Sequence, residues 1–86
     1  MIEQTDKVQK ETISSLRPGE RGIIQNFSVD HIPLKLQEMG CLPGNEVLLI
    51  QWAPFKDPLF LSINGNNLAI RKEMAALIEI SKVLSK

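Results

Sequence analysis

The stretch LQEMGCLPG, residues 36–44, decides the fold, because a helix pattern ends there and a turn pattern follows at once. Ile32, Leu36 and Met39 have the spacing of one apolar stripe on a helix. Gly40 stands where helices commonly end in a residue of left-handed conformation. This stretch therefore predicts a short helix that stops at Gly40.

The residues on either side of that helix predict how the chain enters and leaves it. Asp30 is expected to cap the helix, and Pro33 to lie in its first turn, where a missing N–H costs little. Pro43-Gly44 favours a type II turn, since proline presets the first central φ and glycine accepts the positive second one. The apolar segment 46–52 then predicts a strand that begins directly after this turn.

Further strands are predicted where β-branched and aromatic residues gather between turn residues. Gly22, inside one such segment, marks a bulge or a close approach of two backbones. Five short strands with one inserted helix predict a mainly β fold, a small closed or nearly closed barrel without exposed edges. The other expected elements are strands at Arg21–Phe27, Leu59–Ile63, Leu68–Arg71 and Leu77–Ile80, a hairpin turn at Asn64–Asn67 and one helical turn at Lys72–Ala76.

Length and composition exclude several classes of protein. At 86 residues the chain is expected to form one domain over residues 12–81, after a flexible arm at 1–11 and before a polar tail at 82–86. Lys and Arg balance Asp and Glu to a net charge of zero, which argues against nucleic-acid binding. The single Cys fits a reducing, cytoplasmic compartment. The longest aliphatic run, Val47 to Ile50, is far shorter than the roughly 20 residues that span a bilayer, so direct membrane insertion is not expected.

Catalytic and metal-binding residues are scarce. The only His and the only Cys, His31 and Cys41, would lie about 15 Å apart along a helix, too far to share a proton or an ion. The chain has no phosphate-binding loop, so it is not expected to hydrolyse GTP by itself. With so few reactive side chains, neither enzymatic activity nor a bound cofactor is expected. His31 beside Asp30 is either a solvated histidine in the first helical turn or part of a weak metal site. A second molecule could supply the remaining ligands of such a site.

The apolar residues exceed what a small barrel can bury. The residues expected in the core or near it are Val47, Leu49, Ile63, Ile70, Ile78 and Ile80. The remainder predict an exposed apolar surface, which is typical of protein–protein contact. Trp52 is expected either to line a groove for a partner or to plug one end of the barrel. The candidate partner-binding residues are Met39, Leu42, Pro43, Trp52, Phe55 and Pro58, with the helix end predicted to lie near the loop 54–58.

Four motifs in a fixed order resemble the ferrous iron transport protein A (FeoA) family. They are L-x-P-G-E-x-G-x-I from Leu16, M-G-C-L-P-G from Met39, P-x-x-D-P from Pro54 and N-G-N-N-L-A-I-R-K-x-x-A from Asn64. Each motif is weak by itself, but their order is specific and covers roughly residues 16–80.

The resemblance implies an SH3-like barrel and a cytoplasmic accessory role in ferrous iron uptake. The partner that it implies is a membrane transporter of the FeoB type, contacted at its cytoplasmic GTPase part. Self-association, if any, is expected to be weak. An alternative is a small domain that binds or senses a transition metal, related to the C-terminal domain of iron-dependent repressors. A repressor would also need a DNA-binding region, for which a barrel of this length leaves no space.

Overall fold

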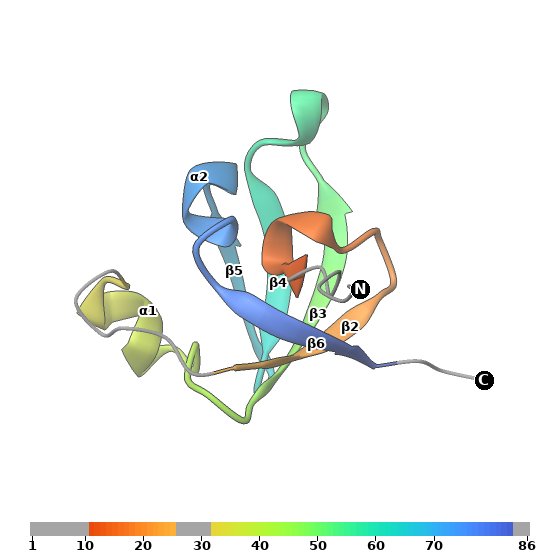
Figure 1. Ribbon diagram of the computed structural model, residues 1–86. Coiled ribbons are helices and arrows are strands. Elements are labelled where there is room, and N and C mark those ends of the chain that lie inside the picture. The colour runs from red at the N-terminus through yellow and green to blue at the C-terminus, as the bar shows by residue number, and fades with distance from the viewer. Residues whose placement is uncertain (1–10, 26–31, 84–86) are drawn as a thin grey trace, which may run out of the picture.

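The computed structural model describes residues 11–25 and 32–83, in which one strongly bent sheet surrounds a small core with two short helices beside it (Figure 1). In this part of the chain six strands form a single antiparallel sheet in the order β1-β6-β2-β3-β4-β5. The α-helices α1 and α2 and the 3-10 helices η2 and η4 lie between strands. In chain order the elements are β1 (Glu11–Thr12), η2 (Ile13–Ser15), β2 (Arg21–Ile24), α1 (Leu34–Glu38), β3 (Glu46–Trp52), η4 (Pro54–Lys56), β4 (Leu59–Ile63), β5 (Asn66–Ile70), α2 (Lys72–Ala75) and β6 (Glu79–Val83).

Strand β2 joins the two halves of the sheet, because it pairs with β3 on one side and with β6 on the other. Gly22, in its second position, is buried, and a Cβ placed there would lie 2.5 Å from Cδ1 of Ile80. Its pairing with both neighbours is regular, so of the two predictions for Gly22 the close approach is confirmed and the bulge is not.

Strands β3, β4 and β5 form a meander. The predicted bounds of β3 and β4 are confirmed at Glu46–Trp52 and Leu59–Ile63. Asn64 and Gly65 both have positive φ, as a two-residue type I′ hairpin requires. The predicted four-residue turn is therefore too long, and β5 begins at Asn66, which pairs with Ile63.

The core lies inside the bend of the sheet. Every residue predicted for it from the strand pattern is buried, and along β4 buried and half-buried side chains alternate strictly. Ile13 and Leu16 also belong to the core, together with Cys41, which follows α1, and Ala75, which ends α2. Burial of aliphatic side chains is the main favourable term in the stability of a chain of this size.

Helix α1 is shorter than predicted. It begins at Leu34 with Pro33 as its N-cap, because Pro33 has an extended ψ of 141° and lies outside the first turn. Asp30, predicted as the cap, lies outside the described residues. Ile32 is buried although it precedes the helix, so the apolar stripe on α1 consists of Leu36 and Met39 alone, both half-buried.

The end of α1 follows the prediction. Gly40 has a φ of 108°, and the side-chain amide of Asn45 donates a hydrogen bond to the carbonyl of Gly40 at 2.7 Å. The N–H of Asn45 also donates to the carbonyl of Leu42 at 3.1 Å, and Gly44 has a φ of 94°. These two features fit the type II turn predicted at Pro43-Gly44.

Three further differences from the sequence analysis concern the strands β2, β6 and β1. Strand β2 ends at Ile24, and Phe27, the predicted end, lies outside the described residues. The last strand begins at Glu79 rather than Leu77, because the N–H groups of Leu77 and Ile78 are still bonded to the turn that ends α2. The sixth strand was missed: the Cα of Glu11 pairs with that of Ile80 in a two-residue ladder too short to leave a sequence pattern.

Replacement of Gly40 by Val is expected to lower the free energy of unfolding by about 1–3 kcal/mol through its left-handed backbone. A Cβ at Gly40 would also lie 3.3 Å from Cγ2 of Ile63, whereas nothing lies within 4 Å of one at Gly44. Gly44→Val, which shares the positive φ, is therefore the control, and it should lower the free energy of unfolding by less, as measured by urea denaturation. An equal decrease for both variants would show that the packing against Ile63 is unimportant.

Candidate protein-interaction site

The loop between β3 and β4, residues 53–58, carries the most exposed large apolar side chain of the described chain. We call it the Phe55 loop, and Figure 1 shows it protruding at the top of the molecule. The N–H of Ala53 donates to the carbonyl of Pro58 at 3.0 Å, and the N–H of Lys56 donates to the carbonyl of Ala53 at 2.8 Å. These bonds close the base of the loop and leave Phe55 95% exposed at its tip.

The tip of the Phe55 loop is held in an unfavourable backbone conformation. Phe55 has φ 64° and ψ 18°, and Lys56 follows with φ 62°. For residues other than glycine, the left-handed backbone conformation costs about 1–2 kcal/mol each. Strain of this kind persists where the surroundings impose it, and it is concentrated at sites that bind or react.

Trp52 supports the loop from below. Its indole is half-buried and packs against the core, while the ammonium of Lys56 lies 4.7 Å from the centre of its ring. A cation over an aromatic face is attracted by the ring quadrupole. Trp52 thus packs against the core and lies beneath Lys56 of the loop, and its role in binding a partner stays a prediction.

Asp57 fastens the Phe55 loop to the segment that begins α2. One carboxylate oxygen accepts a hydrogen bond from the backbone N–H of Lys72 at 3.0 Å, and the other lies 3.5 Å from the guanidinium of Arg71. The loop is therefore tied to a second part of the chain, which lowers the entropy that it would lose on binding a partner.

The other predicted site residues lie elsewhere. Met39, Leu42 and Pro43 precede β3 and the Phe55 loop follows it, so the seven residues of β3 separate them by about 20 Å. The amide of Asn66 donates to the carbonyl of Met39 at 3.0 Å, which places the helix end beside the β4–β5 turn. The prediction of one continuous face is wrong, because both segments are turns at opposite ends of the same strand.

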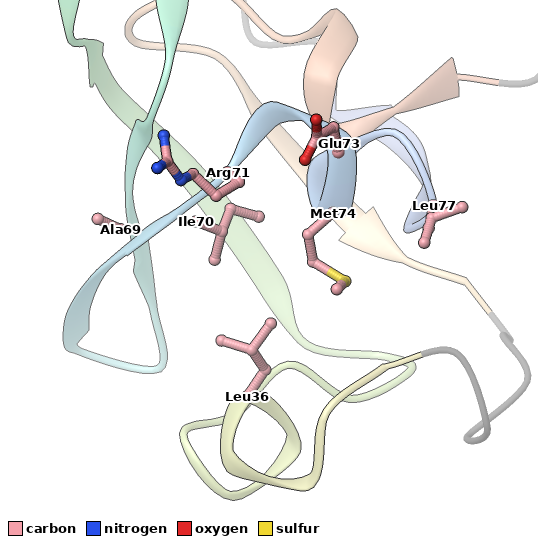
Figure 2. A pocket seen from close by; sticks show the side chains of 7 residues that line it. All are labelled: Leu36, Ala69, Ile70, Arg71, Glu73, Met74 and Leu77. Carbon is pink, nitrogen blue, oxygen red and sulfur yellow. The ribbon is translucent and has the colours of Figure 1, made fainter.

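A shallow groove between the two α-helices was not predicted. Leu36 points from α1 toward Met74 and Ile70, as Figure 2 shows. The cavity has a volume of about 330 Å³, and Leu77 at its edge is 51% exposed. We call it the α1–α2 groove; its lining residues are Leu36, Ala69, Ile70, Arg71, Glu73, Met74 and Leu77.

The sequence contains a pattern that indicates this groove, but its residues were assigned to the wrong element. Met74 and Leu77 are three residues apart, so one helical turn brings their side chains to one side. Placing Leu77 in a strand hid this pair. The sequence also held no sign that α1 packs across from α2, because the two helices are far apart in the chain.

The titratable groups of the described residues form no reactive cluster. Burial raises the pKa of the Cys41 thiol, and the backbone N–H of Arg17, 2.8 Å away, lowers the pKa of Glu20. Across residues 11–25 and 32–83, no three His, Cys, Asp or Glu side chains gather to hold a metal ion. His31 and Asp30 lie outside these ranges, so the weak metal site stays a prediction. No helix in the same ranges has the length and hydropathy to cross a membrane.

We expect Asp57→Ala to lower the free energy of unfolding by about 1 kcal/mol, because it removes the acceptor of the Lys72 N–H. Amide exchange at Lys72 should become faster, since exchange reports local opening. Asp57→Asn keeps an acceptor oxygen and is the matched control. Unchanged exchange at Lys72 in Asp57→Ala would show that this contact does not hold the loop.

Comparison with known proteins identifies the family. A model of the FeoA domain matches residues 11–82. The chain is 31% identical over 74 residues to a Fe(2+) transport protein A/Fe(2+) transporter FeoB fusion protein of Porphyromonas gingivalis, a match that covers 85% of this chain and 9% of that one. This chain therefore spans only a small part of its curated relative.

Solved structures show the same fold. Iron(II) transport protein A from Clostridium thermocellum is 36% identical with a TM-score of 0.74, over 84% of this chain and 45% of that one. A zinc complex of FeoA from Stenotrophomonas maltophilia, described as an SH3 domain protein, superposes with a TM-score of 0.66 at 24% identity, over 84% and 94% of the chains. The described chain thus has the predicted SH3-like fold, and with the domain model matching most of its length it belongs to the FeoA family.

Proposed function

We propose that this chain is a non-enzymatic, cytoplasmic accessory protein of ferrous iron uptake that binds the cytoplasmic GTPase part of a FeoB-type membrane transporter. One observation carries the proposal: in the Porphyromonas gingivalis relative, a FeoA sequence and a FeoB transporter are joined in one polypeptide. Fusion holds two domains at a high effective concentration. Where the two are separate chains, a complementary surface has to replace the covalent link.

The Phe55 loop is the surface that supports such a contact best. Large aromatic side chains are over-represented among the residues that dominate binding energy. Phe55 contributes almost nothing to the core at 95% exposure, and its backbone bears strain that the fold must offset. Trp52 and Pro58, both half-buried, flank the base of the loop and complete the proposed contact.

Met39, Leu42 and Pro43 form a second, separate contact in this proposal. Leu42 is 41% exposed, and the adjacent Pro43-Gly44 turn is held by backbone hydrogen bonds. A standard interface buries about 800 Å² on each partner, a patch wide enough to reach both ends of β3. The two contacts can be tested independently because no substitution in one touches the other.

Phe55→Ala should weaken binding to the purified cytoplasmic domain of a FeoB-type transporter by about thirtyfold, the size expected for a hot-spot residue. The melting temperature should stay unchanged, because the side chain is exposed. Leu34→Ala removes another large exposed side chain, 66% exposed on α1, and should bind like the parent. Equal binding by Phe55→Ala and the parent in calorimetric titration would remove the Phe55 loop from the interface.

Leu42→Glu should weaken the same binding and reduce ferrous iron uptake in cells that depend on this chain. It should leave the fold intact, because Leu42 contributes its backbone to the turn and its side chain is partly exposed. Circular dichroism checks the fold. A folded Leu42→Glu protein with normal binding and uptake would exclude the helix end as a contact.

A further inference from the structure

Three exposed cationic residues lie on the Phe55 loop or on the segment that Asp57 joins to it. Lys56 follows it directly and is held over Trp52, while Arg71 and Lys72 are brought to the loop by their contacts with Asp57. The side chain of Arg71 is 72% exposed although it pairs with Asp57. Phe55 is thus an apolar projection on a loop that carries one cation and is joined by Asp57 to a segment with two more.

The nearby acids offset this charge only in part. Asp57 is occupied by the backbone of Lys72 and the guanidinium of Arg71. Glu73 lines the α1–α2 groove, as Arg71 does, and both are labelled in Figure 2. The loop and residues 71–73 together hold three cations and two carboxylates, a net charge of +1, although the whole chain is neutral.

We infer that the Phe55 loop fits a protein surface with an apolar socket whose rim carries carboxylates. The exposed ring fills the socket, and Lys56, Arg71 and Lys72 face the acidic rim. Rim charges mainly raise the rate of association, whereas a desolvated aromatic anchor mainly slows dissociation. This inference rests on the proposed function, because it describes the site on the cytoplasmic domain of the transporter.

A protein socket accounts for the loop better than an anionic lipid surface. Stable membrane attachment takes more than one apolar anchor. Phe55 is the large apolar side chain exposed on this loop, and of the two prolines beside it Pro58 is half-buried. The fixed backbone of the loop also suits one defined socket, since pre-organisation lowers the ordering cost of binding.

The test measures association and dissociation rates with the cytoplasmic FeoB-type domain at about 0.1 M and about 1 M NaCl, between which the Debye length falls from about 10 Å to about 3 Å. At low salt, Lys72→Glu should slow association by about tenfold, and Phe55→Ala should speed dissociation by about thirtyfold. The fold is preserved in Lys72→Glu, because the backbone N–H of Lys72, not its side chain, bonds Asp57. The control Lys35→Glu makes the same charge change on α1 and should leave both rates unchanged.

High salt should abolish the difference between Lys72→Glu and the parent. If the parent binds but Lys72→Glu associates equally fast at low salt, the acidic rim is wrong and the proposed function stands. If the parent fails to bind at either salt, the proposed function itself fails. Phosphatidylglycerol vesicles that bind the parent but not Phe55→Ala, with transporter binding unaffected by Phe55→Ala, would assign the loop to lipid and overturn the inference.

Discussion

The close approach of β2 and β6 at Gly22 is the constraint on which the rest of the structure depends. In the described part of the sheet, β2 is the only strand that links the β1–β6 pair to the β3–β4–β5 meander. Its buried glycine leaves room for Ile80, whose side chain would otherwise meet a Cβ at 2.5 Å. This contact lets the sheet bend sharply around a core too small to fill a flat sandwich.

The Phe55 loop shows that a domain with a small core can hold a strained turn in place. Two successive residues occupy left-handed backbone space, and neither is a glycine. The cost is offset by contacts from three directions: the hydrogen bonds at the base of the loop, the Trp52 ring under Lys56, and the bonds of Asp57 to the start of α2. A domain of this size has little interior for an enclosed site, so rigid turns that display side chains are its natural means of recognition.

Local patterns succeeded where one segment contains all the determinants of its structure. The apolar residues of β3 and β4, bounded by proline and glycine turns, predicted both strands to the residue. The left-handed Gly40 was predicted for the same reason, because the helix end and the turn are adjacent in sequence. The start of α1 and the start of β6 were misplaced, since Pro33 and Leu77 are each compatible with two structures and packing decides between them.

The sequence by itself determined the mainly β class, the buried strand residues, the turns and, through its ordered motifs, the resemblance to the FeoA family. These depend on side-chain period and on the backbone freedom of glycine and proline, which are properties of short segments. Only the tertiary structure decided which surfaces are contiguous. It separated the helix end from the Phe55 loop, brought Leu36 to Met74, and joined Asp57 to Arg71 and Lys72. Contacts between segments depend on the path of the whole chain, and no local pattern encodes that path.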